Sequence, residues 1–246
     1  MEVELNEVLE SKIFTKENSL VTFQSPKAYL QPFLDIVENQ NFSCKVQDAV
    51  VNENEDHSRN TAFPRVALEA RVGSQVAGYD SVIGVIFALN IQSPVIKVYT
   101  GQNAHACTNL TIFNATAVSQ YSLMNDYSDV YRKADYYLKQ KEAEIEQFVR
   151  VRENLLNEFY NEEELKKELG RLLLATTKKN SKVSYGAIAG ASRLIQDSNS
   201  IYYQKPGDSL SKMTLYDAIT QNITDSVDLL YKPNKTIAVS QLLGIS

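Results

Sequence analysis

Apolar and β-branched residues are densest between Phe63 and Leu123, and their pattern predicts three consecutive strands. The strands are expected at Arg65–Val72, Val82–Asn90 and Pro94–Thr100. The second strand is apolar almost throughout, which is typical of a central strand. Short turns separate the three strands, and such turns favour an antiparallel meander over strands joined by helices.

The first of these strands alternates between two kinds of residue. Its odd-numbered positions are Arg65, Ala67, Glu69 and Arg71, and its even-numbered positions are apolar. Because successive side chains of a strand point to opposite faces of the sheet, the alternation predicts one buried and one solvated face. Both arginines are expected on the open face.

Shorter elements are expected before these strands: a helix around Leu5–Leu9 and strands at Ser19–Gln24 and Val46–Val51. Between them, Ser25 can cap a helix that has Pro26 at its first position. Pro32 lies inside this helical pattern, so the helix either kinks there or begins there.

The period of the pattern changes at Tyr127. From there to residue 160, apolar residues recur at steps of three and four, which predicts one amphipathic helix. A helix over residues 127–160 has about 34 residues and is roughly 50 Å long, at about 1.5 Å per residue. One globular core rarely covers such a length. We therefore expect an arm, a spine across several elements, or the contact of a homo-oligomer.

Further helices follow the long one. Asn161–Glu164 is a capping box for the next helix, whose end carries Lys178 and Lys179 in the order that the helix dipole favours. Ser184 begins a third helix, and Ser198–Ser209 is expected to be a loop.

In the third helix, Gly186 and Gly190 are expected to leave a smooth face for close packing. Thr214–Asp217 is interpreted as a second capping box, which opens a fourth helix. Pro233 is expected to stop that helix, and Thr236–Leu243 to form a short terminal one.

These elements predict an α+β fold, in which an antiparallel β-meander in the first half packs against a long helix and a C-terminal set of helices. Residues 1–126 are expected to form a mixed, β-rich domain with one or two N-terminal helices. Residues 127–246 are expected to form a helical part that packs on the sheet as one globular unit.

The composition narrows the class of protein. The 246 residues are 43% hydrophobic and carry a net charge of -5, which argues against a globally basic, histone-like binder but leaves room for a local basic groove. Two cysteines, Cys44 and Cys107, are too few for a disulfide scaffold. The N-terminus lacks the pattern of a signal peptide, and no apolar run approaches the ~20 residues of a membrane span. We expect a cytoplasmic protein with reduced thiols and no membrane partner.

The sequence offers few catalytic or metal-binding residues. His105 and Cys107 are the obvious nucleophilic pair, but only Asn109 could orient them, so structural burial of Cys107 is favoured. The histidines and cysteines have no zinc spacing, and no phosphate-binding glycine loop is present. We therefore expect no catalytic residues, no metal and no cofactor. A metal-dependent nuclease is the remaining enzymatic alternative, with Glu69 and Asp80 as its strand-borne carboxylates.

Basic and aromatic residues interleave in two segments, as single-stranded nucleic-acid binding requires. The first segment contains Lys178, Lys179, Lys182 and Tyr185, and the second contains Tyr202, Tyr203 and Lys205. Arg65 and Arg71 could add phosphate contacts from the open strand face. The structural alternative is a helix C-terminus completed by lysines and a surface loop that bears tyrosines.

The middle of the chain resembles a phage- and plasmid-associated family called domain of unknown function 932. Its segment after the meander is similar to a Cys-x-Asn-Gly-Leu element, which Cys107, Asn109 and Leu110 match without the glycine. Leu215–Thr224 is similar to an Asn-Ala-Val/Ile-Thr element, with Asp217 where asparagine is usual. The resemblance implies a phage or mobile-element origin and a bacterial cytoplasm, and it implies no settled activity.

A looser analogy connects the meander and the long helix to single-strand annealing proteins of the Rad52-like kind, which act in recombination as rings with DNA in an outer groove. Two hypotheses follow. The first is a non-catalytic, oligomeric protein that anneals or protects single-stranded DNA. The second is a phage protein-interaction, structural or host-takeover factor with no nucleic-acid role.

Overall fold

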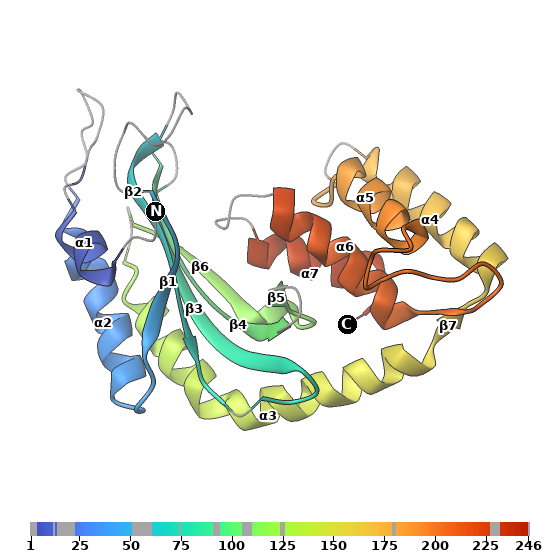
Figure 1. Ribbon diagram of the computed structural model, residues 1–246. Coiled ribbons are helices and arrows are strands. Elements are labelled where there is room, and N and C mark those ends of the chain that lie inside the picture. The colour runs from blue at the N-terminus through green and yellow to red at the C-terminus, as the bar shows by residue number, and fades with distance from the viewer. Residues whose placement is uncertain are drawn as a thin grey trace. The chain divides into compact units, whose positions relative to one another are not determined.

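Strands dominate the first half of the chain and helices the second, so the predicted α+β class is confirmed (Figure 1). The structure is a computed structural model that describes residues 4–11, 13, 23–50, 61–73, 75–90, 94–104, 110–123, 126–178, 181–226 and 232–245. The chain forms two compact units. Unit 1 comprises residues 1–74, 81–100 and 116–142, and unit 2 comprises residues 75–80, 101–115 and 143–246. The predicted domain division at residue 126 stays a prediction.

The described strands form one six-stranded sheet and one pair. The sheet has the order β1-β2-β3-β4-β5, with β6 beside β4. Its strands are β1 (Cys44–Val50), β2 (Thr61–Arg71), β3 (Tyr79–Asn90), β4 (Val95–Ala104), β5 (Leu110–Thr111) and β6 (Val118–Ser122). The pairs β1–β2, β2–β3, β4–β5 and β4–β6 are antiparallel, in agreement with the predicted meander.

One face of the sheet in unit 1 packs against helices. These helices are α1 (Leu5–Glu10), α2 (Pro26–Glu38) and the first half of α3 (Asp129–Asn157). Val66, Leu68 and Ala70 of β2 lie in this core, as the alternation predicts. The Tyr29 ring of α2 stacks on the Phe87 ring of β3 at a centroid distance of 5.0 Å, and the Tyr131 hydroxyl of α3 donates to the Tyr29 carbonyl at 3.0 Å.

The prediction of a solvated second face for β2 is wrong at its centre. Ala67 is buried, and Glu69 is only 6% exposed. The Tyr99 hydroxyl of β4 donates to Oε1 of Glu69 at 2.5 Å, which provides a partner for this buried carboxylate. Arg65 is half-buried and Arg71 is exposed, so the second face of β2 is accessible to solvent only toward the ends of the strand.

A glycine makes this Tyr99–Glu69 contact possible. Gly84 of β3 is paired with Glu69 in the sheet, and the Tyr99 ring occupies the space above it. A Cβ atom at position 84 would lie 2.2 Å from the ring carbon Cζ of Tyr99. The aromatic side chain therefore crosses β3 where no side chain stands, and reaches β2.

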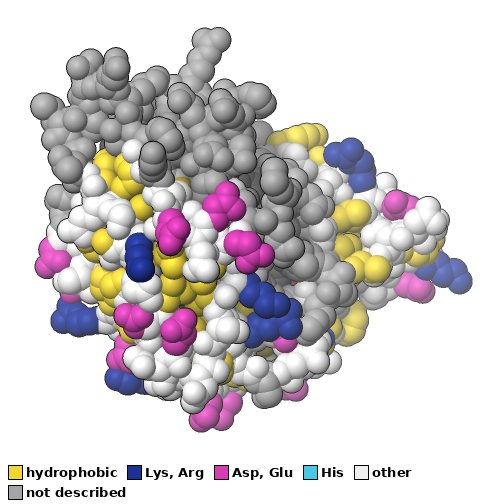
Figure 2. Space-filling view, turned by 60° about the vertical axis from the view of Figure 1, so that its left-hand side comes forward, with side chains coloured by type: hydrophobic (Ala, Val, Ile, Leu, Met, Phe, Trp, Pro, Cys, Tyr) yellow, Lys and Arg dark blue, Asp and Glu magenta, His cyan; other side chains and the backbone are white. Residues whose placement is uncertain are grey.

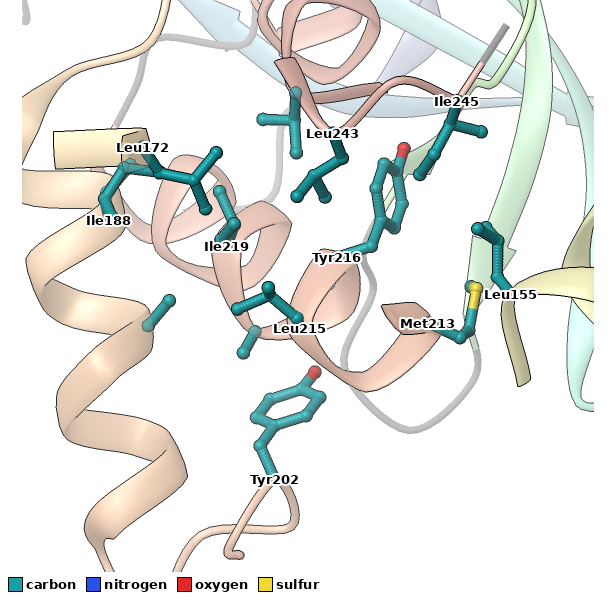
Figure 3. Close-up of a cluster of buried hydrophobic side chains, with 14 of the residues drawn as sticks. Leu155, Leu172, Ile188, Tyr202, Met213, Leu215, Tyr216, Ile219, Leu243 and Ile245 are labelled. Atoms are coloured by element: carbon teal, nitrogen blue, oxygen red, sulfur yellow. The ribbon is translucent and has the colours of Figure 1, made fainter. Parts of the chain in front are cut away.

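Unit 2 contains the C-terminal helices and a short strand pair. Its elements are the second half of α3, the 3₁₀ helix η2 (Ala115–Ala117) at its border, β7 (Phe159–Tyr160), α4 (Glu162–Thr176), α5 (Tyr185–Gln196), β8 (Leu210–Ser211), α6 (Lys212–Ser226) and α7 (Lys232–Leu242). Apolar side chains from all four C-terminal helices meet in one core, which includes Leu172, Ile188, Leu215, Ile219 and Leu243 (Figure 3).

Local capping signals explain most helix starts. Ser25 accepts from the Ala28 amide before α2, and Ser184 accepts from the Ala187 amide before α5. The predicted capping box of α4 is confirmed, because the Asn161 side chain accepts from the Glu164 amide and Glu164 accepts from the Asn161 amide.

Other boundaries differ from the prediction. The long helix spans 29 residues, Asp129–Asn157, and is shorter than predicted at both ends. Pro32 lies within α2, which begins at Pro26. Pro233 lies in the first turn of α7, where proline fits because the first helical amides have no intrahelical acceptor. Of the predicted strand Ser19–Gln24, residues 19–22 are outside the described residues, and the last two residues form no strand.

The capping box predicted at Thr214–Asp217 is wrong. The helix begins at Lys212, and the Ser211 hydroxyl accepts from the Thr214 amide at 3.1 Å. Asp217 therefore lies one turn inside α6, where it is available for a tertiary contact.

Candidate functional site

The first basic and aromatic segment lies in the turn between α4 and α5. Lys178 and Lys182 are exposed, and Tyr185, the first residue of α5, is 62% exposed. Lys179 lies outside the described residues. The buried side chain of Val183 anchors this turn to the core of unit 2, so the three exposed side chains project from a fixed part of the backbone.

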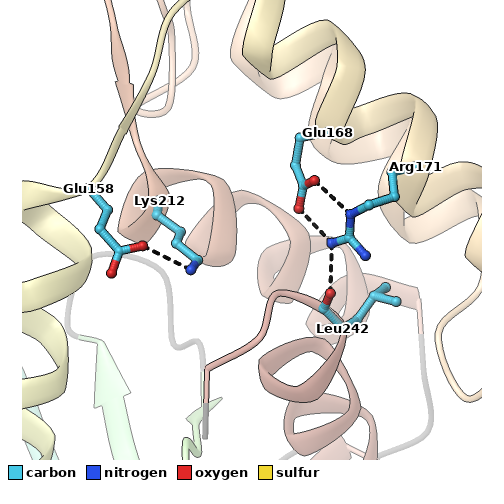
Figure 4. Close-up of polar contacts among 5 residues, drawn as sticks. All are labelled: Glu158, Glu168, Arg171, Lys212 and Leu242. Carbon is cyan, nitrogen blue, oxygen red and sulfur yellow. Dashed lines mark hydrogen bonds and ion pairs between the residues drawn. The ribbon is translucent and has the colours of Figure 1, made fainter.

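This turn lies in a locally basic part of an acidic chain. Residues 171–212 contain seven lysines and arginines but only two aspartates. Two of the cations already have carboxylate partners (Figure 4): Arg171 donates to Glu168, and Lys212 donates to Oε2 of Glu158 at 2.9 Å. Lys178 and Lys182 have no ion-pair partner among the residues that the structure describes.

The two helix ends beside this turn have opposite partial charges, positive at the N-terminus of α5 and negative at the C-terminus of α4. Lys178 follows the end of α4 and does not belong to its last turn, which has no basic residue. The Lys178 amide donates to the Ala175 carbonyl of α4, and the interpretation that the lysines complete that helix end stays a prediction. The amides of the first turn of α5 give its N-terminus a partial positive charge, and Tyr185 lies at that end.

The second segment is only partly available to a ligand. Tyr203 is 41% exposed and Lys205 is exposed, but Tyr202 is 7% exposed and packs in the core of unit 2 (Figure 3). We correct the prediction for Tyr202, because a buried ring cannot stack on a base. The Gln204 amide donates to the Ile195 carbonyl at 2.8 Å, which fixes this loop at the C-terminal end of α5.

The structure does not bring all the predicted residues together. Tyr185 and the Tyr203–Lys205 loop lie at opposite ends of α5, whose 12 residues span about 18 Å at about 1.5 Å per residue. Arg65 and Arg71 belong to unit 1, and both have polar partners there or elsewhere in the chain. The α4–α5 turn is thus the strongest part of the predicted interface.

The face of the molecule shown in Figure 2 has a different character. There, lysines and arginines are interspersed with aspartates and glutamates, and the described part of this face carries no continuous basic stripe.

The two carboxylates considered for a nuclease are both buried, and the nuclease alternative stays a prediction. Glu69 belongs to unit 1 and accepts a hydrogen bond from the Tyr99 hydroxyl, whereas Asp80 belongs to unit 2. The described residues contain no group of three or more His, Cys, Asp or Glu side chains that could hold a metal ion. His57, His105, Cys107 and Asn109 lie outside the described residues.

Unit 2 contains one polar cluster that the sequence pattern did not predict. The Tyr79 hydroxyl donates to Asp217 at 3.2 Å, and the Arg152 guanidinium lies 5.5 Å from the centroid of the Tyr79 ring. Burial raises the pKa of Asp217 to about 7, and the Tyr79 hydroxyl and the positive charge of Arg152 oppose this rise. Burial also raises the pKa of Tyr79, and the charge of Asp217 adds to that effect.

Aromatic rings surround this cluster. Phe148 lies edge-on to Tyr79 at 5.0 Å, and Phe113 stacks on Phe148 at 5.4 Å. Tyr79 and Phe148 are buried, whereas Asp217 and Arg152 are half-buried, so the cluster is partly accessible to solvent. The only signal in the sequence was Asp217 itself, and an aspartate near a helix start is normally explained by capping.

None of the helices in the described part of the chain combines the length and apolar character that a membrane crossing requires. Comparison with known proteins finds no match to any family model, any curated protein or any solved structure. The resemblance to domain of unknown function 932 therefore stays a prediction, and function has to be inferred from the residues of this chain.

Proposed function

We propose that this protein binds single-stranded DNA without catalysis, through the α4–α5 turn, and that it anneals or protects the strand as a homo-oligomer. The observation that carries the proposal is the joint exposure, in the segment between α4 and α5, of the Tyr185 ring and of Lys178 and Lys182, two lysines without an ion-pair partner among the described residues.

The chemistry of this turn suits a single strand. An exposed aromatic ring stacks on any base, because every base has a π-face. Lysines that neutralise phosphates release condensed counterions, which drives binding at low salt. Neither interaction reads sequence, so the proposed binding is general. Tyr203 and Lys205 could contact a strand that continues along α5.

The test is fluorescence anisotropy with a labelled oligo-dT at increasing salt. In K178A/K182A, the slope of log K against log salt is expected to become shallower by about 1.4, since each phosphate contact to a single strand contributes about 0.7. Tyr185→Ala is expected to weaken binding by about 1–3 kcal/mol with little change in slope, because stacking is not ionic.

The matched control is K27A/K167A, which removes two exposed lysines that also have no ion-pair partner among the described residues. This control is expected to keep the slope of the natural chain. An unchanged slope in K178A/K182A would show that these two lysines do not contact the DNA phosphates, so the binding site would lie elsewhere. Absence of binding even at low salt would refute the proposal.

A second candidate function is protein interaction without a nucleic-acid role. Leu174 and Ile201 in unit 2 are each 71% exposed, and Phe159 is 58% exposed. Large apolar side chains at the surface are a usual element of protein interfaces. This candidate predicts no oligonucleotide binding, so the same titration separates the two functions.

A further inference from the structure

The exposed face of α3 has a regular order of charges. Its residues recur at alternating steps of four and three, so they follow one side of the helix. The series is Arg132, Tyr136, Lys139, Ala143, Glu146, Arg150 and Glu153. It lies opposite the apolar stripe of Val130, Ala134, Leu138, Phe148 and Leu155, which is buried in the two cores.

The charges on this face change sign about the middle of the helix. Arg132 and Lys139 lie before the Glu142–Ala143 bond, and Glu146 and Glu153 lie at the same distances after it. Asp135 and Arg150 are also equally far from this bond and have opposite signs. The same holds for Lys141 and Glu144, whereas Lys133 and Arg152, which lie outside the series and are equally far from this bond, are both cations.

From this order we infer that two copies of the chain pair through α3, antiparallel and related by a two-fold axis near Ala143. In such a pair, Arg132 of each copy faces Glu153 of the other, and Lys139 faces Glu146. A two-fold interface must be complementary to itself, and the α3 face meets this condition. The small side chain of Ala143 allows the helices to approach closely at the axis.

Within one chain, Arg132 already donates to Asp129, but its side chain stays 79% exposed and can reach a second carboxylate. Lys139, whose side chain is 67% exposed, donates to Asp135 at 2.5 Å. Glu146 and Arg150 stand four residues apart but form no ion pair, and neither has another ion-pair partner among the described residues. In the antiparallel pair, Arg150 and Glu146 of one copy flank Asp135 and Lys139 of the other. Four charges of alternating sign then form a network.

This inference rests on the homo-oligomer part of the proposed function and specifies its geometry. Its test measures mass and not DNA binding, so the two can fail separately. Light scattering and sedimentation at low salt are expected to give about twice the 27.7 kDa of one chain, with dissociation as salt rises. A monomer at low salt overturns the inference.

Charge reversal identifies the interface. R132E/K139E places glutamates opposite Glu146 and Glu153, and E146K/E153K places lysines opposite Arg132 and Lys139. Each variant alone is expected to dissociate about tenfold or more readily, because like charges facing each other across an interface are costly. The two variants mixed are expected to form a heterodimer, in which every reversed residue again faces an opposite charge.

The heterodimer shows that both variants are folded, so loss of the homodimers cannot be attributed to misfolding. K27E/K167E, which changes the net charge by the same amount as R132E/K139E at exposed lysines outside α3, is the control and is expected to remain dimeric. A dimer that persists in both reversal variants, or a mixture that stays monomeric, overturns the inference.

Discussion

The Tyr79 hydroxyl and the Asp217 carboxylate, 138 residues apart in the sequence, lie 3.2 Å from each other inside unit 2. Partial burial of the Asp217 carboxyl disfavours its charged form, because the negative form loses hydration, and the hydrogen bond from Tyr79 opposes this effect. The raised pKa of Asp217 predicts that the stability of the protein depends on pH between about 4 and about 7.

Stability is expected to fall as pH rises from about 4 to about 7, since the folded state retains the proton of Asp217 and the unfolded chain has already released it. Over these three or so pH units the loss is up to about 4 kcal/mol. Asp217→Asn cannot ionise, so its free energy of unfolding should decline less over this range. Urea unfolding at several pH values measures the difference between the two curves.

Asp208→Asn, at an exposed carboxylate, is the matched control and should give a curve parallel to that of the natural chain. If the stability curve of Asp217→Asn also runs parallel to that of the natural chain, the pH dependence does not come from Asp217. Tyr79, Arg152 and Tyr216 are the charged or titratable groups that act on Asp217 or respond to it, and none is altered by the substitution.

Tyr99→Phe is expected to destabilise unit 1 by about 2 kcal/mol, because it removes a hydrogen bond to the buried Glu69 and keeps the ring in place. Tyr203→Phe removes an exposed hydroxyl and should change stability little. Chemical unfolding of both variants checks the difference. Equal stabilities would show that Glu69 is satisfied without Tyr99.

Gly84→Ala is expected to destabilise by about 1–3 kcal/mol, since its Cβ would overlap the Tyr99 ring and the packed sheet leaves the ring little freedom to move. Gly170→Ala tests the opposite case, because the space around this helical glycine is empty within 4 Å. That variant should gain about 0.5–1 kcal/mol from helix propensity. A neutral Gly84→Ala would mean that Tyr99 does not need to cross β3 at this position.

Gly190→Ala is expected to cost about 1 kcal/mol. Its Cβ would lie 2.0 Å from Oδ1 of Asn222, whose amide would have to turn away from its hydrogen bond to the Ala218 carbonyl. Gly186→Ala meets nothing closer than 3.9 Å and should be neutral or slightly stabilising. Thermal unfolding of the two variants provides the comparison, and similar melting temperatures would argue against close packing at Gly190.

Gly186 and Gly190 illustrate how far the sequence predicts packing. Both were expected to form one smooth face, but only Gly190 contacts another helix closely. Strands β1 to β4, the α4 capping box and the Ser184 cap could be predicted because they depend on neighbouring residues, whereas the shorter strands β5 to β8 were not predicted. The second face of β2 could not be predicted, because its burial depends on Tyr99, which comes from another strand.

In the candidate site, too, the sequence does not predict features that depend on distant parts of the chain. Composition located the basic segments, and the exposure of Lys178, Lys182 and Tyr185 agrees with that prediction. Tyr202 and Tyr203 are adjacent and chemically identical, but one is buried and the other exposed. Only the path of the backbone after α5 distinguishes them, and no local pattern encodes that path.

The division into two units has a consequence for how the protein can be made. The chain passes from one unit to the other after residues 74, 80, 100, 115 and 142. On the ribosome, unit 1 is therefore incomplete until residue 142 has been added, and by then short pieces of unit 2 have already been synthesised. No single cut yields either unit whole, so fragments expressed separately should regain the native fold only when they are brought together.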